Sequence, residues 1–135
     1  MSERRPMVIR GAEAPAPSGP PTAGMERRQL LDEGERWFGW VRTEPGLAGG
    51  WHHHGDRDSY VYVVRGAITI EYGRGGVERI EATAGDLILN PARIVHREVT
   101  GPGEPAEAFV VRLGPGPLNV NVDGPDAGAM ERPEH

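Results

Sequence analysis

The sequence predicts an all-β domain, and three observations support this fold class. Glycine and proline are abundant, with 20 and 13 residues among 135, which suits short strands joined by tight turns and argues against a helix bundle. β-Branched and aromatic residues gather in short runs about ten residues apart, with turn-forming residues between them. No stretch of the chain shows the 3.6-residue hydrophobic period of an amphipathic helix. The length corresponds to one ordinary domain.

The runs predict eight strands in the middle of the chain. The signals between them are glycines and dipeptides such as Glu44-Pro45 and Asn90-Pro91, which end regular strands. Short antiparallel strands at this spacing are typical of a sandwich or a jelly-roll barrel. The expected strands are Arg27–Leu31, Arg36–Thr43, Tyr60–Val64, Ala67–Tyr72, Val77–Ala82, Asp86–Leu89, Val95–Val99 and Phe109–Leu113.

Composition divides the chain into three parts. Residues 1–24 form an arm rich in proline and alanine that we expect to be flexible, although Met7–Arg10 could form a short strand. Residues 25–114 hold the β-barrel domain. Residues 115–135 contain GPGP, DGP and RP, which interrupt regular structure, so we expect an irregular tail there.

Charge and cysteine content exclude several function classes. The net charge is −5 and the basic residues are not clustered, which disfavours nucleic-acid binding because phosphate contacts need concentrated positive charge. No apolar run approaches the roughly 20 residues of a membrane span, and no secretory signal begins the chain. Without cysteine there is no disulfide and no thiolate ligand or nucleophile. We therefore expect a cytoplasmic protein that binds neither nucleic acid nor a membrane.

Four of the five histidines lie in the β-rich part of the chain. His52 and His54 are two residues apart, so on a strand they share one face, and His53 points to the other. His96, from a distant strand, could complete a set of three imidazole donors. Such a set suits Fe, Mn, Ni, Cu or Zn and leaves coordination positions open. A run of three histidines is also compatible with a solvated loop, so the assignment depends on the surrounding spacing.

Two spaced patterns surround these histidines. They are Gly46-x5-His52-x-His54-x4-Ser59-x6-Gly66 and Gly85-x5-Pro91-x-Arg93-x2-His96. In this order they resemble the two motifs of the cupin superfamily, and the resemblance covers residues 40–113. It implies a double-stranded β-helix, also called a jelly-roll or cupin barrel, that holds one divalent transition metal ion through His52, His54 and His96. Iron is the first expectation for this ion, with Mn, Ni, Cu and Zn as alternatives, and the family also implies a homodimer.

The sequence departs from the family pattern where an acidic ligand is expected. Ser59 occupies the glutamate position, and Asp58 is the nearest carboxylate but should face the other way on a strand. A second departure places Arg93 at a glycine position, which we expect to have no cost. Three neutral imidazoles would leave the full charge on a divalent ion, which favours an anionic or bidentate oxygen substrate such as an enolate.

Three functions are compatible with such a site. The first resembles the three-histidine cupin dioxygenases, which use iron to oxidise diketones or thiols, and it is the one we expect. The second is a Lewis-acid isomerase or lyase. The third is a binding or sensor protein without turnover, because one fold hosts many chemistries. In each case the partner is a small molecule.

Further residues are expected beside the metal. Glu98 follows His96 by two positions and should point the same way, which makes it a candidate catalytic carboxylate, although a cross-strand ion pair with an arginine is an equal alternative. Ser59 and Val61 share a strand face and should line the substrate pocket. We also expect Trp40 and Phe109 to line it, while barrel core or a dimer interface is the alternative for aromatic residues.

Overall fold

The computed structural model of the chain describes residues 4–19 and 21–127. Strands dominate this part, which also contains the short 3₁₀ helices η1 (Gly11–Glu13) and η2 (Arg74–Gly76). Within the described ranges, no helix is long and apolar enough to cross a membrane. The strands are β1 (Met25–Asp32), β2 (Arg36–Thr43), β3 (His52–His53), β4 (Asp58–Arg65), β5 (Ala67–Tyr72), β6 (Glu78–Thr83), β7 (Leu87–Asn90), β8 (His96–Val99), β9 (Ala106–Leu113) and β10 (Val120–Asn121).

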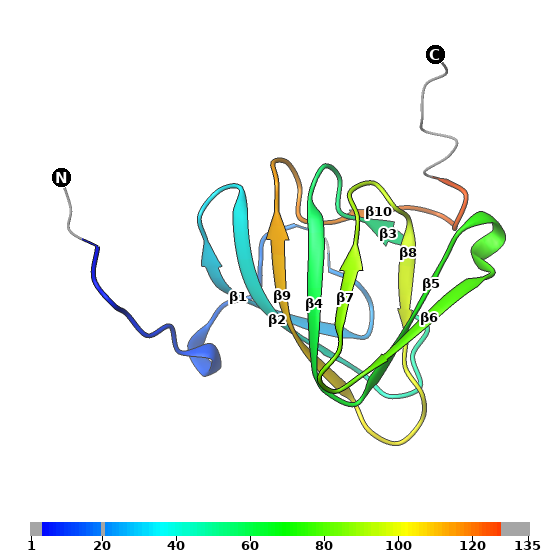
Figure 1. Ribbon diagram of the computed structural model, residues 1–135, viewed down its shortest axis with the longest axis horizontal. Helices are drawn as coiled ribbons and strands as arrows, with labels where there is room; N and C mark the ends of the chain where they lie inside the picture. The colour runs from blue at the N-terminus through cyan, green and yellow to red at the C-terminus, as the bar shows by residue number, and fades with distance from the viewer. Residues whose placement is uncertain (1–3, 20, 128–135) are drawn as a thin grey trace, which may run out of the picture.

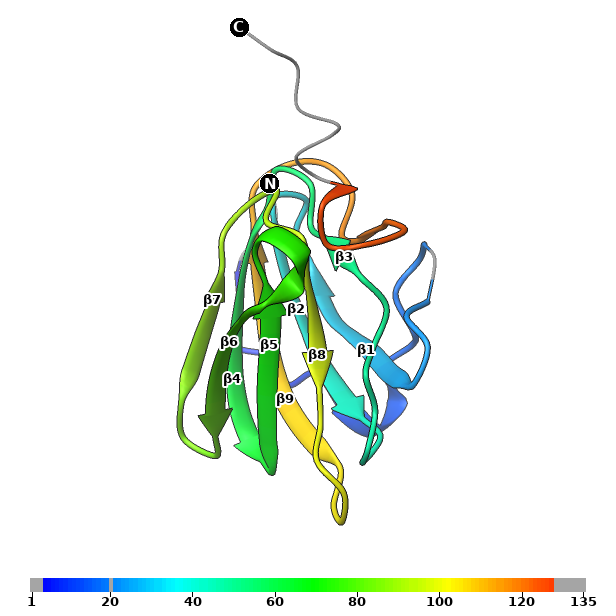
Figure 2. The ribbon, with the colours of Figure 1, turned by 90° about the vertical axis from the view of Figure 1, so that its right-hand side faces the viewer.

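The strands form two sheets that face each other and enclose the core (Figure 1). The first sheet has the order β1-β2-β9-β4-β7, and the second has the order β10-β3-β8-β5-β6. Figure 2 shows the second sheet with β5 and β8 at the front. Neighbouring strands are antiparallel and often distant in sequence. This topology brings side chains from both halves of the chain into the space between the sheets.

Alternation along the long strands separates the core from the outer surface. In β9, Ala106, Ala108 and Val110 are at most 2% exposed, whereas the residues between them are only half-buried. The inward residues form two apolar clusters, one centred on Val63 and Ile70 and the other on Trp37. The period of two seen in the sequence therefore corresponds to the inner and outer faces of each sheet.

A glycine is required where β4 turns into β5. Gly66 has a φ of 77°, in the left-handed region that residues with a Cβ adopt reluctantly. A Cβ at this position would lie only 2.7 Å from the carbonyl oxygen of Pro105. Conformation and space therefore both explain the glycine that the first sequence pattern places here.

The observed strands differ from the predicted ones at their ends and by two additions. β4 begins at Asp58 and β9 at Ala106, and β6 is displaced by one residue from its predicted range. The added strands, β3 and β10, are two residues long and pair with each other. β10 lies within the predicted irregular tail, so this part of the tail belongs to the second sheet. Residues 128–135 lie outside the described residues.

The N-terminal arm also differs from its prediction. Met7–Arg10 is not a strand, and Met7 and Val8 are 75% and 70% exposed. Closer to the barrel, the Gln29 N–H donates to the Pro15 carbonyl at 2.6 Å, and the Arg28 side chain donates to the Ala12 carbonyl at 3.0 Å. The second half of the arm therefore packs along edge strand β1. Residues 1–3 and 20 lie outside the described residues.

Candidate metal centre

Three buried histidines converge between the sheets. His52 on β3 is the direct register partner of His96 on β8, and His54 follows β3 by one residue. Their ring centroids are 4.5 to 5.1 Å apart, and one ligand nitrogen from each lies within 4.8 Å of the others. The three residues are at most 2% exposed. His53 points away from this group, as alternation predicts, and its Nδ1 accepts the Gly55 N–H.

Backbone carbonyls orient all three rings in the same way. The Nδ1 atoms of His52, His54 and His96 each lie 2.9 Å from a carbonyl oxygen, belonging to Gly50, Leu118 and Ile94. A carbonyl can only accept, so each Nδ1 carries the proton and each Nε2 presents a lone pair in the neutral ring. Metal-ligating histidines use such partners to fix the tautomer and the ring orientation.

The protonation state of the rings suits metal binding. Burial lowers the pKa of His52 to about 4, although the Glu98 charge opposes this. Burial also lowers the pKa of His54 well below its usual value, with a further contribution from the Arg112 charge. The buried Nε2 of His96 has no hydrogen-bond partner among the described residues. Neutral imidazoles with inward lone pairs, one of them unpartnered, form a group that could hold a divalent transition metal ion.

A carboxylate lies against this group. The Glu98 oxygens are 3.6 Å from His52 Nε2 and 3.3 Å from His96 Nε2. Burial raises the pKa of Glu98, whereas His52 and His96 in their protonated forms and the Arg27 charge lower it; with neutral rings, the Arg27 charge is the contribution that favours the carboxylate form. Glu98 does face the same way as His96, as its spacing predicts. The sequence predicts no acidic ligand at the Ser59 position, and the carboxylate beside the histidines comes from Glu98 on β8.

The position expected for an acidic ligand faces the centre but carries a hydroxyl. Ser59 is fully buried on the inner face of β4, and its Oγ lies 3.4 Å from the donating Arg112 Nε. Asp58 points elsewhere and accepts the Ala92 N–H at 2.9 Å, which holds the turn before β8. Ser59, and not Asp58, is therefore the residue that faces the interior.

A small cavity opens between the histidines and the first sheet. Its volume is about 30 Å³, which is space for roughly two or three water molecules. Aliphatic side chains, including Val61, form much of its wall, and Ser59, Glu98 and the histidines His52 and His54 also line it. The placement of Ser59 and Val61 on one wall agrees with their shared strand face.

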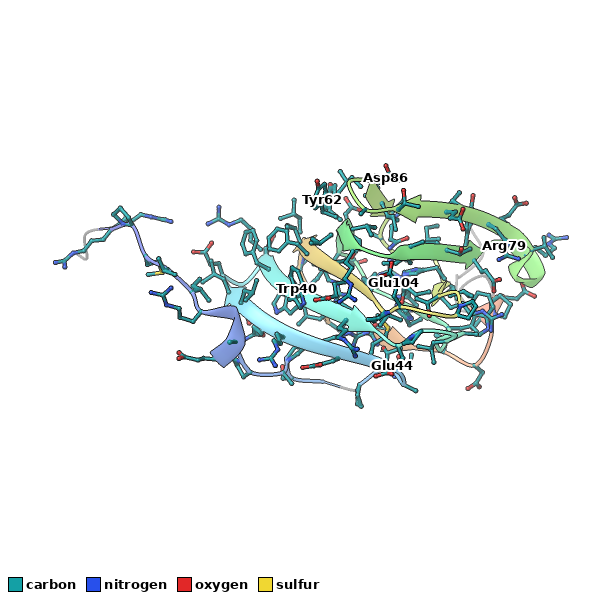
Figure 3. All side chains as sticks on the ribbon, turned by 90° about the horizontal axis from the view of Figure 1, so that it is seen from below. Trp40, Glu44, Tyr62, Arg79, Asp86 and Glu104 are labelled. Carbon is teal, nitrogen blue, oxygen red and sulfur yellow. The ribbon has the colours of Figure 1, made fainter. Side chains whose placement is uncertain are left out.

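Trp40 and Phe109 lie outside this cavity, which corrects their expected placement. They are register partners on β2 and β9, on the face opposite to Val41 and Val110. Phe109 also pairs with Tyr62 on β4, which lies at the periphery of the molecule in Figure 3. The aromatic residue of β2 that points inward is Trp37, which is fully buried. The strand alternation separates these two tryptophans, but it does not say which face is inner.

Four polar residues of the cavity wall are missing from the sequence-based site, namely Arg27, Thr43, Asn90 and Arg112. Arg112 shares the inward face of β9 with Val110 and Ala108, and Asn90 shares that of β7 with Ile88. The detectable signal is a polar residue in phase with an apolar strand face. Such a residue breaks the alternation, and a buried site is the usual reason.

Comparison with known proteins places this geometry in a family. The sequence profile of the family described as Cupin domain matches residues 39–112, more than half of the chain. The chain belongs to the cupin family. Its two sheets are the double-stranded β-helix of that family, and the three histidines occupy the motif positions identified from their spacing. No curated protein sequence matches the chain.

Solved structures share this cupin fold at low sequence identity. An uncharacterized conserved protein with a double-stranded β-helix domain from Klebsiella pneumoniae is 18% identical, with a TM-score of 0.69 over 88% of this chain and 99% of that one. The polyketide cyclase RemF from Streptomyces resistomycificus is 20% identical, with a TM-score of 0.69 over 96% and 95%. KdgF from Halomonas sp. is 21% identical, with a TM-score of 0.62 over 81% and 94%. These identities show a shared fold alone.

Proposed function

We propose that this cupin is a metal-dependent dioxygenase that acts on a small chelating organic substrate. One observation carries the proposal: three buried imidazoles converge, and two of them, His52 and His54, line a cavity together with aliphatic side chains. Three neutral nitrogen donors on one side of an ion leave positions for oxygen donors of a substrate. Iron is the metal we expect, because when bound it supplies a redox centre that reacts with O2.

The chain's own residues hold and shield the reacting groups. The carbonyls of Gly50, Leu118 and Ile94 orient the three rings, so little reorganisation is needed when a ligand binds. The aliphatic wall excludes water and accommodates apolar O2. Incorporation of both atoms of O2 uses only electrons from the substrate, so no additional reductant is required. Glu98 places a negative charge beside two of the ligand nitrogens.

The size of the cavity restricts what can enter. A volume of about 30 Å³ admits a group of roughly two or three heavy atoms beside the histidines. Only the reacting end of a substrate, such as an enolate or a carboxylate, fits this space without movement of the wall. Small substrates with adjacent oxygen donors are therefore the first to test.

A Lewis-acid isomerase, lyase or cyclase is the second candidate function. One observation favours it: the Glu98 carboxylate lies within 3.6 Å of two ligand nitrogens, where it could move a proton. The polyketide cyclase RemF has the same fold. A polarised carbonyl and a nearby base suffice for enolisation. This chemistry needs no O2, which separates it from the first candidate.

Oxygen consumption distinguishes the two candidates. The iron-loaded protein is incubated with a panel of β-diketones, thiols and catechols, first in air and then under argon. A dioxygenase consumes O2 and incorporates both atoms of ¹⁸O2 into product, as mass spectrometry detects. Turnover under argon, retained with Zn or Mn, would contradict the dioxygenase and support the Lewis-acid enzyme. Saturable binding without product at any metal loading would overturn both.

A further inference from the structure

Two guanidinium groups, one buried and one half-buried, lie on the cavity wall contributed by the first sheet. Arg112 on β9 is 4% exposed, and its Nη1 donates to the Leu118 carbonyl at 3.2 Å while its guanidinium packs over the Trp37 ring. Arg27 on β1 is half-buried, and its Nη2 donates to Thr22 Oγ1. Among the described residues, neither arginine forms a salt bridge with a carboxylate, although exposed arginines of the same chain do.

The charges around the cavity do not balance. Glu98 contributes one negative charge to the lining, and Arg27 and Arg112 contribute two positive charges. Burial, and then the Arg27 charge, lower the pKa of Arg112 to about 9, which leaves it protonated at neutral pH. Buried charges are normally paired because their desolvation is costly. A divalent ion at the histidines would increase the excess of positive charge around the cavity. We therefore expect a further anion to bind there.

Unused hydrogen-bond donors point to the same ligand. Arg27 Nε and Asn90 Nδ2 are buried without a partner, and both residues line the cavity. Asn90 is the register partner of Ser59, and Ser59 is the register partner of Arg112, so these three polar residues form one row across the inner face of the sheet. Buried donors rarely remain unsatisfied in folded proteins. Their arrangement along one wall provides hydrogen bonds for an acceptor group in the cavity.

We propose that Arg27, Arg112 and Asn90 form an anion subsite that binds a carboxylate of the substrate beside the histidines. This inference rests on the proposed function, because it identifies the substrate as a small organic acid. Arginine binds planar carboxylates with two parallel hydrogen bonds. A carboxylate has three heavy atoms, which matches a cavity of about 30 Å³, whereas a phosphate group is larger. The guanidinium groups would recognise the charge, and His52 and His54 line the same cavity.

Anion binding to the metal-free protein tests the subsite directly. Isothermal titration calorimetry with acetate, acetamide and inorganic phosphate compares a carboxylate with its uncharged analogue and with a larger anion. We expect acetate to bind at least tenfold more tightly than either of the others.

Arg27→Gln should weaken acetate binding tenfold or more, because a buried anion loses a charged partner. Arg27→Lys keeps the charge but loses the two parallel hydrogen bonds, so its acetate affinity should lie between those of the wild type and Arg27→Gln. Arg79→Gln, which removes an exposed charge on β6, is the matched control and should bind acetate as the wild type does.

Several results would overturn the subsite. They are equal binding of acetate and acetamide by the wild type, tighter binding of phosphate, or unchanged acetate affinity in Arg27→Gln. The comparison of ligands on the wild-type protein stays decisive if a variant fails to fold. Because no metal is present, this binding measurement does not depend on whether the protein consumes O2. If the protein consumes O2 but shows no preference for carboxylates, only the subsite proposal is contradicted. If it binds carboxylates but turns over no substrate, only the dioxygenase proposal is contradicted.

Discussion

Each histidine of the candidate centre depends on a backbone carbonyl. The partners of the three Nδ1 atoms are Gly50, Ile94 and Leu118. Two of these carbonyls lie two residues before their histidine, so the local turn orients the ring. The third comes from a segment 64 residues away. Ring orientation is therefore set by main-chain geometry, and a change in these turns would affect metal binding without altering a ligand.

The buried rings predict how acid affects the metal-free protein. Burial lowers the pKa of His52 to about 4 from its ordinary 6.5. Between these values the unfolded chain binds a proton at His52 that the folded protein does not, so the free energy of unfolding falls as the pH falls from 6.5 toward 4. The slope is up to about 1.4 kcal/mol per pH unit for each such group, and His54 adds to it in the same direction.

Urea unfolding of the metal-free protein at pH 7, 6 and 5 measures this dependence. We expect a steady loss of stability toward pH 5, and a shallower loss in His52→Gln, which has no titrating ring at this position. Stability that is constant or increases toward pH 5 would show that the rings are not buried in their neutral form.

Arg93 predicts a stability difference between two simple variants. Its φ is 66°, and no other non-glycine residue in the described part of the chain has a positive φ. Arg93 also occupies the motif position expected to be glycine. The sequence-based expectation that this departure has no cost is corrected, since a left-handed residue with a Cβ costs roughly 1 kcal/mol. Arg93→Gly should therefore be about 1 kcal/mol more stable than Arg93→Ala in chemical denaturation. Both variants lose the exposed ion pair with Asp56, so that loss does not contribute to the difference between them. Equal stabilities of the two variants would show that the left-handed backbone at this position carries no cost.

At the scale of elements, the short strand β10 supports the centre from outside the barrel motifs. Its two residues pair with His52 and His53, and the Val122 N–H donates to the Trp51 carbonyl at 3.0 Å. The Leu118 carbonyl just before it orients His54. The segment around β10 therefore contacts both Trp51, just before His52, and His54 itself, which are the two ends of the stretch that carries two of the three histidines.

Substitution of Val122 tests this support. Val122→Pro removes the N–H that bonds Trp51 and should weaken metal affinity by about tenfold or more, as loss of outer contacts does in metal sites. Val122→Ala keeps the N–H and serves as the control. The measurement is a competition titration with a chelator. Equal affinities in the two variants would show that β10 does not position the histidines.

The sequence could predict the long elements and could not predict the short ones. The alternation from Arg36 to Thr43 marks β2 with the observed bounds, because eight residues give several repeats of the two-residue period. β3 and β10 have two residues each, which is too few for any period, and they form through pairing with each other and of β3 with β8. Their proline- and glycine-rich surroundings resemble a loop in composition.

The same reasoning explains which site residues could be predicted. His52, His54 and His96 follow from strand alternation combined with motif spacing, and Glu98 follows from its spacing to His96. Trp40 and Phe109 were misplaced because alternation assigns residues to two faces without saying which one is inner. Arg112 is marked by its phase on the apolar face of β9, but that it lines one cavity with Arg27 follows from the strand order β1-β2-β9, which no local pattern shows.

At the scale of the whole molecule, the outer face of the first sheet carries several large apolar side chains. This face carries Phe38, Trp40, Tyr62 and Phe109, and it continues to Leu87 and Leu89 on edge strand β7, which are 63% and 51% exposed. One edge of this face carries both negative and positive charges, because Glu107 on β9 is the register partner of Arg42 on β2 and of Arg65 on β4. We propose that a second copy of the chain covers this face, because a two-fold interface must be complementary to itself and exposed apolar patches mark interaction sites.

Light scattering after size-exclusion chromatography tests the dimer. We expect the wild type to have twice the mass of one chain and the double variant Leu87→Glu/Leu89→Glu to be monomeric, because charge repels across an apolar interface. Val77→Glu introduces the same charge at a residue that is 74% exposed and lies outside the first sheet. This control should remain a dimer. A monomeric wild type, or a double variant that still dimerises, would contradict the proposed interface.

We expect the three inward histidines to bind one metal ion together. Substitution of His54 and of its neighbour His53 tests this most directly. His54→Asn and His53→Asn remove rings one residue apart, of which only the first faces the centre. Elemental analysis and metal titration should find one divalent ion per wild-type chain, similar binding in His53→Asn, and at least a tenfold weaker affinity in His54→Asn. A wild-type protein that binds no divalent metal, or equal affinity in the two variants, would contradict the account.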